Sequence, residues 1–170
     1  MPFDHLSLRS VTESDLPIFF TFQQDPTANH IAAFTAEDPT DHAAFTAHWQ
    51  RILVTETVVI RTIVLHPQID GAQEQIAGYV LSYEEEGKTE VSYWIDRALW
   101  GQGIATQALT LFLAERTTRP LHARVAKDNI GSRRVLEKCG FAVIGEEQGF
   151  ANARGQEIPE LILVLKPSTR

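Results

Sequence analysis

Apolar residues recur along the chain at two spacings, and each change of spacing marks a change between strand and helix. Apolar and polar residues alternate over residues 6–9, which predicts a first strand. Leu16, Phe19 and Phe20 then fall three and four positions apart, as residues on one face of a helix do. Thr12 precedes them, and its side chain is suited to cap the first turn of this helix.

A second helix is predicted over residues 41–53, where Phe45 and Trp49 mark the inner face. Asp38 or Thr40 is suited to cap it. The next part of the chain is rich in β-branched residues and turns at short intervals. It predicts three successive strands, at residues 57–65, 75–83 and 89–95.

The helical spacing returns at Ala105 and continues to Leu113. The remaining pattern predicts a strand, a helix ending before Gly140 and two closing strands, at residues 121–125, 132–139, 141–144 and 161–165. The predicted order is βααβββαβαββ. This order indicates an α/β (α+β) fold in which antiparallel hairpins come first and one crossover helix lies in the middle.

Composition and charge narrow the classes of protein. The 170 residues, 44% hydrophobic and 22% charged, suit one domain over residues 1–170. Cys139 is the one cysteine, so no intramolecular disulfide is expected, which agrees with a cytoplasmic location. The net charge of -7 disfavours nucleic acid as a partner. No secretory signal and no apolar run of about 20 residues is found, so no membrane association is expected.

A turn rich in glycine carries the first chemical signal. It lies between a predicted strand and a predicted helix and reads Trp100, Gly101, Gln102, Gly103, Ile104, Ala105 and Thr106. Glycines allow the backbone to approach a ligand, and the first amides of a helix attract anions, so the turn is suited to a pyrophosphate. An ordinary strand-to-helix turn is the alternative, because short Gly-x-Gly patterns are common.

Two other phosphate-binding motifs do not fit. The Walker pattern ends in Gly-Lys-Ser/Thr, which the sequence lacks. The dinucleotide fingerprint requires a small residue at the position of Thr106 and an acidic residue about 20 positions later, and neither is present.

The chain resembles the GNAT superfamily of acyl-CoA-dependent N-acyltransferases, most closely its Rim-type branch of ribosomal-protein N-terminal acetyltransferases. Three stretches carry the resemblance: residues 90–95 (EVSYWI), residues 100–106 (WGQGIAT) and residues 129–141 (NIGSRRVLEKCGF). They occur in the family's order and lie within residues 90–141, a span of about a third of the chain. The resemblance implies a single domain with a mixed, mostly antiparallel twisted sheet and helices on both faces.

The resemblance also implies a site for acetyl-CoA as co-substrate. Backbone groups of Trp94, Ile95 and Asp96 would pair with the pantetheine arm, as an added strand does. The turn from Trp100 to Thr106 would hold the pyrophosphate. Asn129 and Ser132 would contact the pantetheine and the sulfur, and the adenosine-side phosphate would meet Arg133, Arg134, Lys138 or Lys127. For these basic residues, a solvated helix face is the alternative.

For catalysis, the resemblance makes Glu90 the candidate base that takes a proton from the amine. A glutamate in solvent at a hairpin edge is the alternative, and His66 and His122 are weaker candidates. Many relatives protonate the leaving thiolate with a tyrosine, but Leu136 stands at that place. In the Rim-type branch the serine of the Asn-x-x-Ser stretch can donate to the thiolate, so the resemblance makes Ser132 the candidate donor; its alternative role is to cap the helix that starts there. Cys139 is expected to be a buried structural thiol.

These residues lead to two hypotheses about function. The first is direct transfer of acetyl from acetyl-CoA to a primary amine, either a protein N-terminus or a small amine. The second is a non-catalytic acyl-CoA-binding sensor or interaction module. An acceptor pocket is expected between the first two helices and the loops at residues 26–41 and 145–155. A homodimer is a further expectation, and no metal is expected because the histidines lack ligand spacing.

Overall fold

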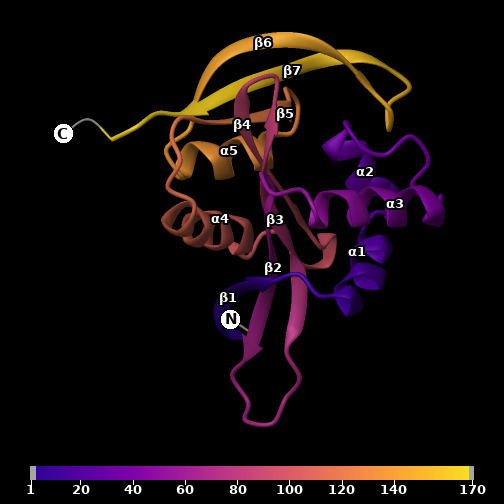
Figure 1. Ribbon diagram of the computed structural model, residues 1–170, viewed down its shortest axis with the longest axis vertical. Coiled ribbons are helices and arrows are strands. Elements are labelled where there is room, and N and C mark those ends of the chain that lie inside the picture. Colours follow the sequence, from indigo (N-terminus) through magenta and orange to yellow (C-terminus); the bar gives the residue numbers. More distant parts are fainter. Residues whose placement is uncertain (1–2, 169–170) are drawn as a thin grey trace.

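A seven-stranded sheet runs through the molecule and separates two groups of helices (Figure 1). The structure, a computed structural model, describes residues 3–168. The strands are β1 (Phe3–Ser10), β2 (Val59–Pro67), β3 (Gln75–Glu85), β4 (Lys88–Ile95), β5 (Leu121–Ala126), β6 (Ala142–Ala151) and β7 (Gln156–Leu165), in the spatial order β1-β2-β3-β4-β5-β7-β6. Neighbouring strands are antiparallel except β4 and β5, which are parallel. The predicted mixed, mostly antiparallel sheet is confirmed.

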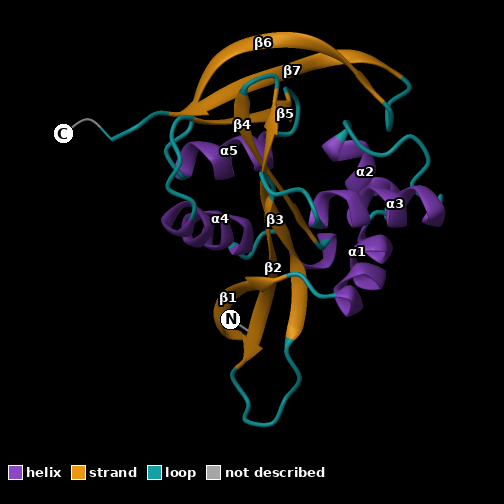
Figure 2. Cartoon of the chain, in the orientation of Figure 1, coloured by secondary structure: helices purple, strands orange, loops and turns teal. Residues whose placement is uncertain are grey.

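The helices cover both faces of this sheet, as Figure 2 shows. One face carries α1 (Leu16–Phe22), α2 (Pro26–Ala32) and α3 (His42–Leu53), and the other carries α4 (Ile104–Glu115) and α5 (Ile130–Lys138). Two short 3-10 helices are η1 (Glu13–Asp15) and η2 (Arg97–Leu99). Among residues 3–168, no helix is long and apolar enough to cross a membrane.

Helix α2 is missing from the predicted order, which assigned its residues to a loop. Its seven residues include one large apolar side chain, Ile31, so no apolar stripe at helical spacing marks it in the sequence. Its start carries local signals nevertheless. Pro26 occupies the first turn, and the carboxylate of Asp25 accepts hydrogen bonds from the amides of Thr27 and Ala28 at 2.9 and 3.2 Å.

Two predicted helix caps are wrong. The carboxylate of Asp41 caps α3 by accepting from the amide of Ala44 at 2.9 Å, whereas Asp38 closes its own turn with Thr40. Helix α5 begins at Ile130, two residues earlier than predicted, and Asn129 caps it. In each case the residue immediately before the first helical residue reaches the free amides; Asp38 and Thr40 lie too early in the chain to do so for α3, and Ser132 already lies inside the first turn of α5.

The closing strands β6 and β7 are longer than predicted, and they include most of the segment expected to be the loop at residues 145–155. Strand β6 lies at the edge of the sheet and most of its residues are exposed, so it lacks the apolar alternation of a half-buried strand. The turn between β6 and β7 spans residues 152–155.

Two apolar clusters hold the helices to the sheet. One cluster lies between the sheet and helices α4 and α5 and includes Leu109, Phe112 and Leu163, each fully buried. On the opposite face, Phe19 of α1 and Trp49 of α3 pack with ring centroids 5.0 Å apart. Both helix groups are therefore fixed to the central strands, on which the site described below is built.

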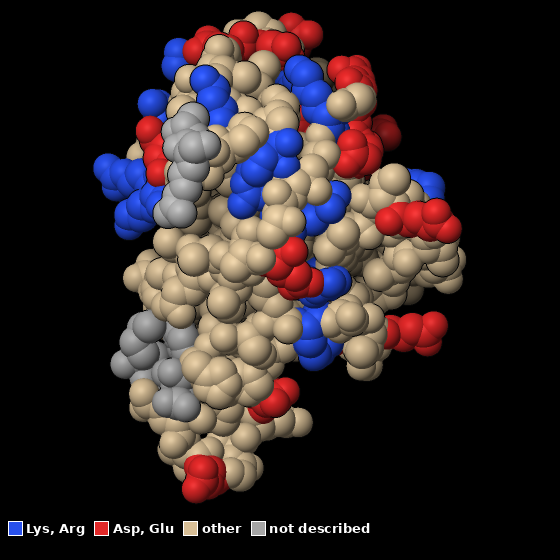
Figure 3. All heavy atoms as spheres, turned by 60° about the vertical axis from the view of Figure 1, so that its left-hand side comes forward, with Lys and Arg blue, Asp and Glu red and all other residues tan. Residues whose placement is uncertain are grey.

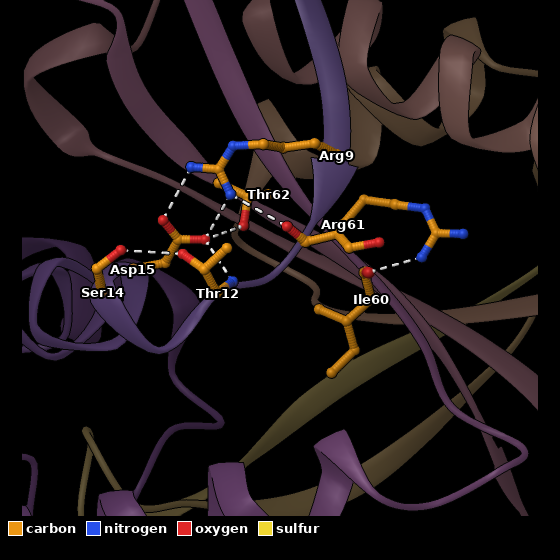
Figure 4. Close-up of polar contacts among 8 residues, drawn as sticks. Arg9, Thr12, Ser14, Asp15, Ile60, Arg61 and Thr62 are labelled. Atoms are coloured by element: carbon orange, nitrogen blue, oxygen red, sulfur yellow. Dashed lines mark hydrogen bonds and ion pairs between the residues drawn. The ribbon is translucent and has the colours of Figure 1, made fainter.

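A buried carboxylate joins the first strand to its neighbours (Figure 4). Asp15 is 1% exposed and accepts two hydrogen bonds from the guanidinium of Arg9, at 2.7 and 2.9 Å. It also accepts from the amide of Thr12 at 2.9 Å and the hydroxyl of Thr62 at 2.8 Å. Burial alone would raise the pKa of Asp15, but these donors outweigh it and lower the pKa to about 2.

Candidate active site

The parallel strands β4 and β5 meet at one end and then diverge. Within residues 3–168, they pair at Glu90 and His122 alone. Beyond this point the edge of β4 that faces β5 has no sheet partner, although β3 continues to pair with β4 as far as Ile95. A wedge-shaped opening therefore lies in the middle of the sheet.

The backbone of β4 presents free groups to this opening. The amide of Asp96 donates to the carbonyl of Ala77 on β3 at 2.8 Å. Because alternate residues of a strand face the same neighbour, the amides of Tyr93 and Ile95 face the opening instead. The carbonyl of Ile95 accepts a hydrogen bond from the indole of Trp100 at 2.9 Å, so the amides on this edge are the groups available to a ligand.

Glycine at position 78 allows β3 and β4 to lie this close together. A Cβ atom there would stand 1.9 Å from the carbonyl oxygen of Trp94 and 2.9 Å from its carbonyl carbon. Any side chain at Gly78 would therefore push away the part of β4 that forms the wall of the opening.

The glycine turn before α4 forms an uncapped helix start. Gly101 and Gly103 have φ angles of 81° and 76°, a region that favours glycine. Gly103 precedes the first residue of α4, and no side chain caps this end of the helix. No side chain therefore occupies the first amides of α4, which is the arrangement that an anion-binding helix start requires.

The turn opens into a cavity of about 420 Å³ between β4, α4 and α5. Ten of the predicted cofactor residues line it: Trp94, Ile95, Trp100, Gly101, Gly103, Ile104, Ala105, Thr106, Asn129 and Ser132. Asp96, Gln102 and Arg133 do not line this first cavity. The carboxylate of Asp96 accepts from the amide of Ala98 at 3.2 Å, and Arg133 pairs with Glu137 at 3.0 Å.

Two other basic residues of α5 lie at the first cavity. Arg134 and Lys138 line it, one helical turn apart, and neither forms an ion pair within the described residues. Figure 3 turns the face with α4 and α5 toward the viewer and shows Lys and Arg side chains gathered on it. Lys127 is outside the cavity lining and pairs with Glu146 at 2.8 Å. The free positive charge at this cavity therefore comes from Arg134 and Lys138.

Ser132 has a different local role from the predicted helix cap. Asn129 accepts a hydrogen bond from the backbone amide of Ser132 at 3.2 Å, which leaves the Ser132 hydroxyl free. That hydroxyl lies 2.7 Å from the hydroxyl of Tyr93, and either oxygen can be the donor. Burial raises the pKa of Tyr93 to about 12, so its hydroxyl stays protonated.

Glu90 is buried, and its interpretation as a solvent-exposed hairpin residue is wrong. The residue is 4% exposed and lies between Tyr83 on β3 and His122 on β5. Burial raises the pKa of its carboxyl, while Arg124 and His122 act in the opposite direction. Nε of Arg124 lies 3.8 Å from the Glu90 carboxylate.

The two histidines differ in their relation to Glu90. His122 pairs with it in the strand register, and the Nδ1 atom of His122 is buried with no hydrogen-bond partner in the described chain. His66 lies elsewhere: it bonds Ser7 at 2.6 Å and stacks on the ring of His5. It lines neither cavity.

A second cavity, of about 560 Å³, opens beside Glu90. Helices α1 and α3 contribute no residue to its lining, contrary to the predicted acceptor pocket. Ala32 of α2 and Phe34, together with β6 and β7, form its outer part instead. The predicted segments at residues 26–41 and 145–155 do border the cavity, as a short helix with its following turn and as a strand.

The two cavities are joined. Five residues line both: Ala32, Tyr93, Trp94, Asn129 and Ser132. A ligand in the first cavity and a ligand in the second would thus meet beside the Tyr93 and Ser132 hydroxyls. The arrangement is suited to a class of protein that brings two substrates together across a divided sheet.

Comparisons with known proteins identify the family. The profile of the acetyltransferase (GNAT) domain matches residues 5–142, and the chain belongs to this family of acetyltransferases. A search of curated protein sequences gives no match.

Solved structures share the fold. RimL, a ribosomal L7/L12 α-N-protein acetyltransferase in complex with coenzyme A, has a TM-score of 0.77 at 18% identity, over 95% of this chain and 94% of that chain. The microcin C7 self-immunity acetyltransferase MccE, in complex with acetyl-CoA and AMP, gives 0.77 at 16%, over 96% and 93%. Spermidine N-acetyltransferase from Vibrio cholerae, in complex with CoA and spermine, gives 0.73 at 18%, over 94% and 95%.

Cys139 takes no part in this site. It is partly buried, and its sulfur lies 3.8 Å from the hydroxyl of Thr110 and from the carbonyl of Thr106. Burial raises the pKa of its thiol, which keeps it protonated and unreactive.

Proposed function

We propose that the protein transfers acetyl directly from acetyl-CoA to a primary amine. One observation carries the proposal: a cavity with an anion-binding helix start and a cavity with a buried carboxylate meet at two hydroxyl groups. A protein that only sensed acyl-CoA would have no use for the second cavity or for the carboxylate within it.

Acetyl-CoA is assigned to the first cavity. The free amides of the turn from Gly101 to Thr106 would hold its pyrophosphate, and Arg134 and Lys138 would meet its adenosine-side phosphate. The free amides of Tyr93 and Ile95 would bind the pantetheine arm in the manner of an added strand. The Asn129-to-Ser132 spacing and the absence of the tyrosine at Leu136 favour the Rim-type branch of the family.

Glu90 would act as the base. An amine is mostly protonated near neutral pH and must lose a proton to attack the thioester carbonyl. A carboxyl whose pKa burial raises is a stronger base than an exposed one, and it can take this proton directly or through one water.

Ser132 and Tyr93 would serve the leaving group. As the new C–N bond forms and the C–S bond breaks, negative charge moves to sulfur. The Ser132 hydroxyl would donate its proton to this thiolate, and the Tyr93 hydroxyl, 2.7 Å away, would in turn donate to the Ser132 oxygen. The amide of Tyr93 or Ile95 is suited to stabilise the charge on the carbonyl oxygen.

The first test is a calorimetric titration with acetyl-CoA, with NAD and ATP as controls, followed by a thiol-release assay with a panel of primary amines. Binding of acetyl-CoA alone and amine-dependent release of CoA are the expected results. Binding without CoA release from any amine would favour the non-catalytic alternative. Failure to bind acetyl-CoA would overturn the assignment of the first cavity.

A further inference from the structure

The second cavity carries an excess of negative charge. Its lining contains five carboxylates and two cationic side chains: Glu85, Glu86, Glu90, Glu147 and Glu160 against Lys88 and Arg124. The formal charge of the lining is therefore -3. In a partly enclosed space this charge is less screened than on an open surface, so it attracts a cationic ligand.

The arginine in this lining forms its hydrogen bonds with two other glutamates and only a longer ion pair with Glu90. Nη1 of Arg124 donates to Glu147 at 2.9 Å and to Glu160 at 3.0 Å, and these bonds, together with the two negative charges, raise the pKa of the guanidinium. Glu90 is left with the longer contact to Nε of Arg124 at 3.8 Å. Within the described residues, its carboxylate accepts no hydrogen bond, although it is 4% exposed. Buried carboxylates normally have donors, so a donor from a ligand is expected here.

The carboxylates are arranged along the strands at two levels. Glu90 on β4 lies opposite Tyr83 on β3, and Lys88 lies opposite Glu85. Side chains two residues apart on a strand point to the same face, so Glu85 and Glu90 share the face that borders the cavity. The two levels are about 7 Å apart along the strands, the length of a chain of about four methylene groups.

We propose that the acceptor carries a second positive charge about four methylene groups from the amine that reacts. This inference rests on the proposed function and names the class of its second substrate. The reacting nitrogen would lie between Glu90 and the Tyr93–Ser132 pair, and the second cation beside Glu85 and Glu86. A free diamine or polyamine has this chemistry, and so does an N-terminal lysine, in which four methylene groups separate the ammonium from the Cα that bears the reacting amine.

The test compares ligands matched in length. The protein loaded with CoA is titrated with 1,4-diaminobutane and with butylamine, and in a second arm with lysyl-alanine amide and norleucyl-alanine amide. The expected result is affinity about 5-fold to 10-fold higher for the dicationic member of a pair at low salt, because each exposed ion pair contributes modestly. The difference should shrink as salt is added. The arm with the larger preference identifies the source of the cation.

Matched variants test the assigned carboxylates. The double variant Glu85→Gln/Glu86→Gln should lose most of the preference, whereas Glu157→Gln, an exposed position on β7 outside the lining, should keep it. Equal affinity for both members of both pairs would overturn the inference, as would a preference that the double variant retains.

Turnover separates this inference from the proposed function. A thiol-release assay with the same four amines should follow the order of affinity. Preferential binding of the dications without CoA release would support the inference and refute the acetyltransferase function. CoA release that is as fast with butylamine as with 1,4-diaminobutane, at equal affinity, would support the function and refute the inference.

Discussion

Replacing Gly78 by alanine tests whether the spacing of β3 and β4 sets the shape of the site. The added Cβ would stand 1.9 Å from the carbonyl oxygen of Trp94 and 3.1 Å from Cα of Ile95. These are backbone atoms, which cannot rotate away, and carbon atoms do not approach closer than 3.0 Å in this way. The end of β4 must therefore move by about 1 Å or more, at the wall of the first cavity.

This displacement should lower both stability and function. Overpacking of this kind costs about 1–3 kcal/mol in the free energy of unfolding, and a displacement of about 1 Å at a reacting centre can reduce the rate about 10²-fold. Urea denaturation measures the loss of stability, a thiol-release assay measures the loss of rate, and calorimetric titration with acetyl-CoA shows whether the first cavity still binds its ligand. Gly145→Ala is the matched control, because its Cβ would meet only the Ile162 side chain at 3.9 Å. A Gly78→Ala protein with the stability and acetyl-CoA affinity of this control would refute the reasoning.

Three further predictions concern ionisable and hydroxyl groups. Glu90→Gln should lower kcat about 10²-fold and leave acetyl-CoA binding unchanged. It should also abolish the acid limb of the pH–rate profile, which lies above the ordinary carboxyl pKa because burial raises the pKa of Glu90. An unchanged kcat would exclude Glu90 as the base. Tyr93→Phe should lower kcat about 10-fold. In a double-mutant cycle, the variant that also carries Ser132→Ala should lose less kcat than the product of the two single losses, because the two hydroxyls act together. Two independent losses would contradict a shared role. Asp15→Asn should remove about 2 kcal/mol of stability at pH 7, measured by urea denaturation. Because the pKa of Asp15 is lowered to about 2 in the folded protein, the parent should lose this stabilisation as the pH falls from about 4 to about 2, and the variant should show no such loss.

The sequence predicted the parts of the fold in which local pattern and tertiary structure agree. The apolar stripe after Gly103 faces the core of the folded protein, so the helical spacing located α4 within one residue of its start. The paired glycines in the turn before it have the positive φ angles that their position suggested. Central strands β2, β3 and β4 were found because their residues are buried on at least one face.

The parts that were missed depend on short-range capping or on exposure. Strand β6 is an edge strand whose residues face solvent, so its sequence has no reason to alternate. The start of α5 was misplaced because Ser132 is a good capping residue by type, while Asn129 reaches the free amides first. Only the folded backbone decides between two candidates three residues apart.

Tyr93 was missed because its partner is distant in the chain. Its hydroxyl meets that of Ser132 across 39 positions, and no spacing rule connects a strand residue with a helix that follows much later. A weak signal was available. Strand alternation places Tyr93 on the face opposite Glu90, which is the face that α5 covers.

The burial of Glu90 and the opening beside it have the same cause. Strands β4 and β5 pair at Glu90 and His122, and burial of Glu90 at this point raises the pKa of its carboxyl, against the opposite effect of His122. Beyond that pair the strands diverge, and Tyr93 and Trp94 come to line both cavities. A change in the angle between the strands would alter the basicity of Glu90 and the space for the substrates together. Substitutions at His122 should therefore affect the pH dependence of the reaction and the affinity for the acceptor in parallel, rather than one without the other.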